Sequence, residues 1–197
     1  MNRITALFCS AGTGGVSVGN DDELYQAFLL GDIAALDTLV LRYRERLTAY
    51  LNTMLHSTED AEDMAMEAFA RIMAKKPRIA KGNFRAYLYQ TARHLTFRFR
   101  QKYRLETAGL DDIHIPEYKT AEEIVMEAER SRILHRCMER MEAAVREALW
   151  LIYFENMSYV QAAKVMRVTS KKIDNLLMKG KRLLRTELEK EGITNAK

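Results

Sequence analysis

The residues with the clearest chemical character form a basic and aromatic block at positions 71–104. This block holds 11 Lys or Arg residues and no Asp or Glu, so its charge is uncompensated. Basic side chains hold phosphates, while exposed aromatic rings stack unpaired bases. The block therefore favours a nucleic-acid surface, and the alternative is a solvated basic face with one stray aromatic. Its aromatic residues are Phe84, Tyr87, Tyr89, Phe97, Phe99 and Tyr103.

Helical periodicity divides this block into an inner and an outer face. Residues at helical spacing form one apolar stripe that we assign to the core: Phe84, Leu88, Ala92, Leu95 and Phe99. The opposite face carries Gln90, Arg93, Phe97 and Arg104. The sequence therefore predicts that Phe97 is exposed among arginines.

The segment before the basic block has the opposite charge. Residues 21–70 hold 11 acidic and 3 basic residues, and residues 105–128 hold 7 acidic and 1 basic. Within the stretch "STEDAEDM", Ser57 or Thr58 can cap a helix whose early carboxylates suit its positive end. Its outward face would repel DNA, so it favours a basic protein surface as partner. The alternative is a solvated face. That face carries Asp60, Asp63, Met66, Glu67 and Ala70.

A second basic surface follows from the stretch "SYVQAAKVMRVTSKKIDNLL". Ser158 and Gln161 form a capping box, and Thr169 or Ser170 starts a new helix four residues after the first one ends. Small and apolar residues face each other across the turn, as in a helix-turn-helix that reads a major groove. An ordinary helical hairpin is the alternative. The outward face of the second helix carries Lys171, Asn175, Met178 and Arg182, flanked by Lys172 and Lys179.

The whole chain is predicted to be all-α, with two helical bundles joined by an acidic linker and the helix-turn-helix in the second bundle. Hydrophobic residues make up 48% and charged residues 29%, which indicates a folded protein. Pro77 and Pro116 mark lapses of helical periodicity. We predict a tail at 1–20, domains at 21–104 and 120–197, and a linker at 105–119. The predicted helices are 22–30, 32–55, 58–75, 83–103, 120–141, 142–156, 158–166 and 169–191, with a Thr120–Glu123 capping box on the fifth.

Several classes of function are disfavoured. Cys9, Cys137 and the four histidines form no metal-ligand pattern, and no paired carboxylates or phosphate-binding glycine loop indicate an enzyme. We expect no metal, cofactor or small-molecule substrate. Without a disulfide framework, a secretory signal or a membrane-spanning run, we expect a cytoplasmic protein.

The motifs together resemble a known family. "DAEDMAMEAFARIM", "NFRAYLYQTARHLTFRFRQKYR", an acidic linker and "YFENMSYVQAAKVMRVTSKKIDNLL" follow one another as in the extracytoplasmic-function sigma factors of bacterial RNA polymerase. The resemblance covers residues 22–189 and implies two sigma domains that bring core polymerase to promoters and help to melt them. It also implies the β′ clamp helices, the β flap, promoter DNA and an anti-sigma factor as partners.

The resemblance assigns three groups of site residues. The core polymerase-binding residues are Asp60, Asp63, Met66 and Glu67. The minus-10 DNA-binding residues are Arg78, Lys81, Asn83, Arg93 and Phe97. The minus-35 DNA-binding residues are Ser170, Lys171, Lys172, Asn175 and Lys179.

The chain departs from the family pattern at several positions. Met66 stands where the family often has glutamine, Tyr87 replaces a tryptophan, and Arg167 occupies a turn position usually held by glycine. A left-handed Arg167 would cost on the order of 1 kcal/mol. Lys171 and Asp174 also differ from the common pattern, so the promoter sequence does not follow from the relatives.

Two other classes stay open from the residues alone. A polymerase-independent helix-turn-helix regulator would explain the second domain, but it should dimerise and bind duplex DNA alone. A helical protein-interaction adaptor would explain the acidic faces but not the basic aromatic block.

Overall fold

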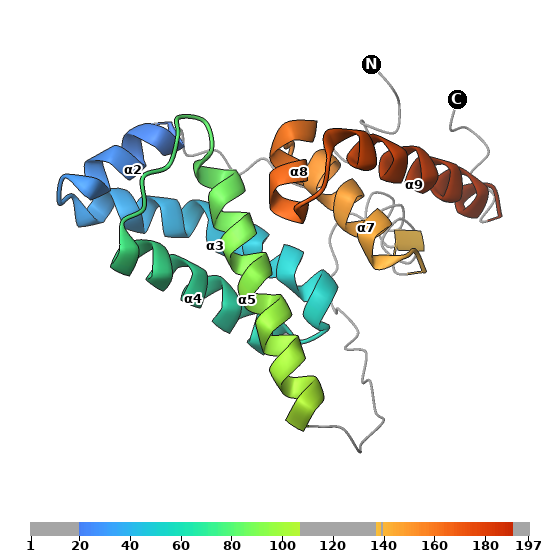
Figure 1. The fold of residues 1–197 in the computed structure, drawn as a ribbon, viewed down its shortest axis with the longest axis horizontal. Helices are drawn as coiled ribbons and strands as arrows, with labels where there is room; N and C mark the ends of the chain where they lie inside the picture. Colours follow the sequence, from blue (N-terminus) through green and yellow to red (C-terminus); the bar gives the residue numbers. More distant parts are fainter. Residues whose placement is uncertain (1–19, 107–136, 139, 191–197) are drawn as a thin grey trace, which may run out of the picture. The chain divides into compact units, whose positions relative to one another are not determined.

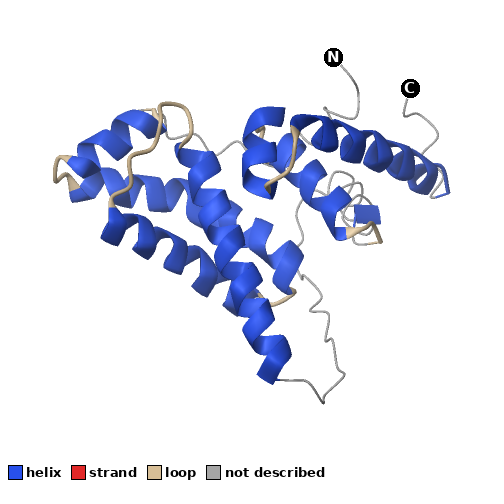
Figure 2. Ribbon diagram, viewed as in Figure 1, coloured by secondary structure: helices blue, strands red, loops and turns tan. Residues whose placement is uncertain are grey.

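The computed structural model describes residues 20–106, 137–138 and 140–190, and all regular structure in these ranges is helical (Figure 2). The chain divides into two compact units, Val16–Glu117 and a unit that includes Tyr118–Lys197. The all-α fold class is thereby confirmed. Most of the tail at 1–20, of the linker at 105–119 and of the helix at 120–141, including its Thr120–Glu123 capping box, lies outside the described residues, and the domain boundaries stay predictions.

The described part of the first unit contains four helices, three of which begin at a capping residue. They are α2 Asp21–Leu29, α3 Ile33–Leu55, α4 Thr58–Lys75 and α5 Phe84–Glu106 (Figure 1). Asn20 forms a capping box with Glu23, Asp32 accepts a hydrogen bond from the Ala35 N–H, and Ser57 accepts one from Asp60. These ends lie within three residues of the predicted ones.

The core of this unit is built around α3, which packs against α2, α4 and α5. Its buried face carries Leu39, Leu47 and Leu51, all without measurable exposure. Tyr50 lies against Tyr89 of α5 with 5.1 Å between ring centroids. Because leucines and aromatic rings from different helices interdigitate here, α4 and α5 have fixed outward faces.

The second unit contains α7 Ala143–Leu149, a π-helical turn η1 Trp150–Phe154, α8 Tyr159–Met166 and α9 Ser170–Lys190. The predicted helix at 142–156 is helical from Ala143 to Phe154, and its second half is a π-helix that ends two residues earlier than predicted. The wider turn brings the Trp150 and Phe154 rings into a stack with centroids 4.5 Å apart. Periodicity alone does not distinguish such a turn from an α-helix.

None of the helices in the described ranges is long and apolar enough to cross a membrane.

Candidate polymerase and promoter interfaces

The outward face of α4 is acidic with an apolar centre. Asp63, Met66 and Glu67 are exposed, with Met66 at 45%, and Asp60 is half-buried. Glu67 pairs with Arg71 one turn later at 2.7 Å. Three of the four predicted polymerase-binding residues are thus exposed as expected, and Asp60 is partly covered. An exposed methionine between carboxylates is suited to a partner that offers an apolar contact flanked by basic residues.

This face continues into a shallow groove of about 760 Å³ between α4 and α5. The sequence pattern did not indicate the α5 side of this groove, which is lined by Arg98 and Lys102. Phe99, expected in the core, is only half-buried and lies in this groove. Its ring stacks on that of exposed Tyr103, with centroids 6.2 Å apart. The groove is lined by Asp63, Met64, Met66, Glu67, Ala70, Arg71, Leu95, Arg98, Phe99 and Lys102.

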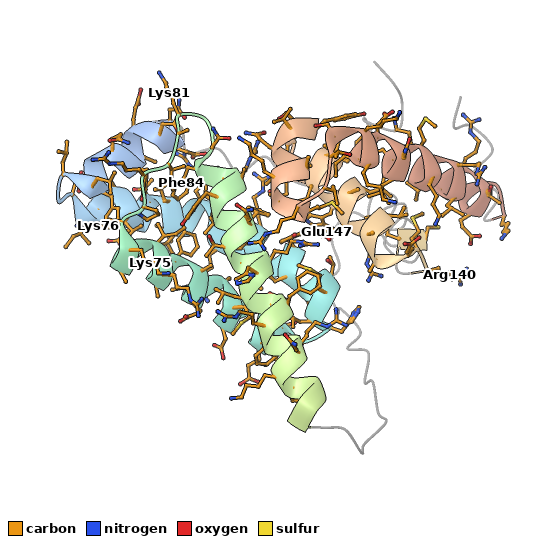
Figure 3. All side chains as sticks on the ribbon, viewed as in Figure 1. Lys75, Lys76, Lys81, Phe84, Arg140 and Glu147 are labelled. Carbon is orange, nitrogen blue, oxygen red and sulfur yellow. The ribbon has the colours of Figure 1, made fainter. Side chains whose placement is uncertain are left out.

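The loop between α4 and α5 presents two basic side chains. Arg78 and Lys81 are exposed, and Figure 3 shows Lys81 at the outer turn of the loop, with Phe84 below it at the start of α5. Asn83 is half-buried, and its side-chain amide donates a hydrogen bond to the Lys81 carbonyl at 3.1 Å. These three residues form one cluster on the loop.

Arg93 and Phe97 form a second cluster on α5. The Arg93 guanidinium carbon lies 4.5 Å from the centroid of the Phe97 ring, which is 45% exposed. Arg93 lies ten positions after Asn83, and the rise over those positions along α5 is about 15 Å. That length matches roughly four nucleotide steps of 3.4 Å, so the two clusters can contact different nucleotides of one strand.

The predicted helix-turn-helix is present in α8 and α9. Ser158 and Gln161 form the expected capping box, and Thr169, rather than Ser170, accepts a hydrogen bond from the Lys172 N–H at 3.2 Å. Arg167 is left-handed, with φ 55° and ψ 47°, so the turn carries a strain of about 1 kcal/mol. Buried Ala163 and Ile173 lie on the packed sides of the two helices.

The outward face of α9 carries all five predicted minus-35 residues in exposed positions: Ser170, Lys171, Lys172, Asn175 and Lys179. Lys179 differs from the others because its ammonium group lies 2.5 Å from a carboxylate oxygen of Glu142. The hydrogen bond from Lys179 lowers the pKa of Glu142, and the charges of Lys179 and Lys172 act in the same direction. A phosphate brought to Lys179 would therefore have to compete with the Glu142 carboxylate.

We expect Glu142→Gln to raise the affinity of the protein for a minus-35 duplex roughly threefold, because the competing carboxylate charge is removed. The slope of log affinity against log salt should steepen by about one if Lys179 gains a phosphate contact. Fluorescence anisotropy across a salt series measures both. Glu142 makes no capping hydrogen bond to α7, so the variant should fold normally.

The matched control is Glu187→Gln, which also removes one carboxylate that is paired with basic residues, here Lys190 and Arg140. Equal gains in both variants would mean that overall charge, rather than release of Lys179, sets the affinity.

Across the described ranges, no group of three His, Cys, Asp or Glu side chains is arranged to hold a metal ion.

The order of these surfaces matches two domains of one class of transcription factor. The model of sigma-70 region 2 matches residues 39–105, which include the α4 face, the loop and α5. The model of sigma-70 region 4 matches residues 131–184, which include the helix-turn-helix. The fold and its surfaces therefore define a sigma factor that contains regions 2 and 4.

Individual relatives narrow this class. The chain is 27% identical to the RNA polymerase sigma-H factor of Pseudomonas aeruginosa over 164 residues, which cover 75% of this chain and 82% of the relative. It is 25% identical to the ECF RNA polymerase sigma factor SigW of Bacillus subtilis over 170 residues, which cover 80% and 91%. The chain belongs to the extracytoplasmic-function sigma factors. Sigma factors are non-catalytic initiation factors, so the expectation of a non-enzyme is confirmed.

Solved structures agree on the fold. CnrH in complex with the cytosolic domain of CnrY aligns with a TM-score of 0.59 and 20% identity, covering 86% of this chain and 97% of CnrH. The sigma factor RpoE in complex with the anti-sigma factor NepR from Bartonella quintana aligns with a TM-score of 0.63 and 18% identity, covering 78% and 96%.

Proposed function

We propose that this sigma factor binds core RNA polymerase through α4, melts the minus-10 element with the α4–α5 loop and α5, and reads the minus-35 element with α9. The observation that supports this assignment most strongly is the separation of charge. The α4 face is acidic, whereas the loop and the outward face of α9 are basic. Surfaces of opposite sign suit a protein partner and DNA, respectively.

The α4 face would bind the β′ clamp helices of the polymerase. Asp60, Asp63 and Glu67 supply charge, and Met66 supplies an adaptable apolar contact. Basic side chains on the clamp helices would complement these carboxylates. This contact would fix the orientation of the protein on core polymerase and so position both of its DNA-binding surfaces.

Strand opening would use binding energy alone. Stacking a base on an aromatic side chain contributes about 1–3 kcal/mol, and unstacking a base from duplex DNA costs a few kcal/mol. One captured base at the Arg93–Phe97 pair is therefore insufficient, and phosphate contacts from Arg78 and Lys81 add the stabilisation required. Asn83 would contact a base edge at the start of α5.

The α9 surface would read duplex DNA. The N-terminal half of a recognition helix lies in the major groove, where Asn175 can make two hydrogen bonds to an adenine. Lys171, Lys172 and Lys179 would contact phosphates, and Ser170 would contact DNA at the start of the helix. The β flap of the polymerase would hold this domain at the minus-35 element.

Regulation would come from an anti-sigma factor that covers the polymerase- and DNA-binding surfaces, and the protein would act in the cytoplasm. Support for this partner comes from the aligned RpoE structure, which contains the anti-sigma factor NepR.

Permanganate reactivity of thymines tests the melting role. Holoenzyme with the wild-type chain should make minus-10 thymines reactive, whereas Arg78→Ala with Lys81→Ala should reduce the reactive fraction about tenfold and leave core binding unchanged. Lys164→Ala with Arg185→Ala is the control, since these exposed residues of the second unit remove the same charge. Full reactivity in the loop variant would contradict the assignment.

A further inference from the structure

The α4–α5 loop is fastened to α2 near both of its ends. At the first end, the Tyr25 hydroxyl donates a hydrogen bond to the Pro77 carbonyl at 2.6 Å. At the second end, the Gly82 N–H donates to a carboxylate oxygen of Asp22, also at 2.6 Å. The exposed Arg78 and Lys81 lie between these two attachment points. Figure 1 shows the loop beside α2.

Each attachment lies beside a residue with left-handed backbone. Lys76, next to Pro77, has φ 40°, and Gly82 itself has φ 76°. The Lys76 ammonium group also lies 5.1 Å from the centroid of the Phe28 ring on α2. The contacts with α2 thus hold the loop where its backbone changes direction, and so determine the path of the residues between.

Tyr25 is a rigid attachment point. Its side chain is 1% exposed, and its ring lies 5.2 Å from the Phe84 ring at the start of α5. Burial, with a smaller contribution from Tyr87, raises the pKa of Tyr25 to about 12, so the hydroxyl stays protonated and remains a donor at physiological pH.

The helix that carries these groups is itself anchored. Asp21, at the start of α2, accepts a hydrogen bond from Tyr43 and pairs with Arg42 at 2.5 Å, both on α3. The loop is therefore connected through α2 to the core of the first unit. A rigid support of this kind reduces the number of conformations that a binding loop must give up when it contacts its ligand.

We propose that Asp22 and Tyr25 are positioning residues that set the base preference of the loop at the minus-10 element. This inference rests on the proposed function, in which the loop contacts that element. The two residues act through the loop backbone, and neither needs to touch DNA. A loosened loop would keep its charges and lose its ability to distinguish bases, because phosphate contacts tolerate displacement and base contacts do not.

Substitutions can remove each attachment with little effect on folding. Tyr25→Phe keeps the buried ring and removes the hydroxyl. Asp22→Ala removes the carboxylate that accepts the hydrogen bond from the Gly82 N–H. Because this hydrogen bond is solvent-exposed, water can accept from the N–H instead. Asp22→Asn keeps an acceptor oxygen and removes the charge. Asp37→Ala, at an exposed position on α3, is the control for loss of one negative charge.

The experiment measures transcription by each reconstituted holoenzyme from a set of promoters with every base at each minus-10 position. For the Asp22→Ala and Tyr25→Phe double variant, we expect the ratio of rates on the best and second-best bases to fall about tenfold. Core affinity should remain within about twofold of wild type, because α4 is unchanged. Asp22→Asn should retain most of the discrimination, and Asp37→Ala all of it.

Other outcomes would overturn the inference. A uniform loss of rate with unchanged base ratios would show a purely structural role, and unchanged rates and ratios would show that the attachments have no effect. The Arg78→Ala and Lys81→Ala variant tests the proposed function separately. If it leaves melting and base ratios intact, the loop is not the reader; if it alters them while the double variant does not, only the positioning inference fails.

Discussion

Replacement of Asp63 and Glu67 by lysine is expected to reduce the affinity for core polymerase about a hundredfold or more, because like charges then face a basic surface. Both side chains are exposed on α4, so the fold should be retained. The variant loses only the Glu67–Arg71 pair within the helix, which is worth about 0.3–0.5 kcal/mol. Fluorescence anisotropy of labelled protein titrated with core polymerase measures the affinity.

A matched control changes the same charge elsewhere in the first unit. Asp37 and Glu45 are exposed acidic residues of α3, and their replacement by lysine also changes the net charge by four. We expect this control to retain core affinity within about threefold. Equal losses in both variants would mean that the overall charge matters and that α4 is not the binding surface.

Gly180→Leu is expected to destabilise the second unit by about 2 kcal/mol and to weaken minus-35 binding. A Cβ atom on Gly180 would lie 2.9 Å from Cδ1 of Leu149 and 3.0 Å from Cγ1 of Val145. Leucine adds three further carbon atoms in this buried contact between α9 and α7. Leucine has a better helix propensity than glycine, but this difference offsets less than 1 kcal/mol of the free-energy cost of overpacking.

Thermal unfolding of the full chain by calorimetry, with duplex binding by anisotropy, checks this prediction. The unfolding temperature of the second unit should fall by about 10 °C, while that of the first unit should not change. Met178→Leu introduces the same side chain at a neighbouring exposed position and should behave as wild type. An unchanged transition in Gly180→Leu would contradict the close packing of α7 and α9.

Local sequence signals were sufficient to predict where several helices begin and which of their faces point outward. The ends of α4 and α8 follow from Ser57 and from the Ser158–Gln161 box, and periodicity places the outward faces of α4 and α9. Such signals lie within a few residues of what they determine. The left-handed Arg167 was one of two alternatives raised by the family resemblance, in which glycine usually holds this turn position, and the residue has φ 55°.

Features that depend on distant residues could not be predicted in this way. The contacts of Tyr25 with Pro77 and of Asp22 with Gly82 span 52 and 60 residues. The Lys179–Glu142 pair spans 37 residues, and nothing in the periodicity of α9 sets Lys179 apart from its neighbours. The groove between α4 and α5 likewise exists only once the two helices pack together.

Run-off transcription with purified core polymerase tests the proposed function most directly. Genomic promoter fragments are transcribed with core alone, with core and the wild-type chain, and with core and the Asp63→Lys, Glu67→Lys variant. We predict transcripts with defined start sites only in the presence of the wild-type chain. Absence of both transcripts and core binding, together with tight binding of duplex DNA by the protein alone, would contradict the sigma-factor assignment and favour a polymerase-independent regulator.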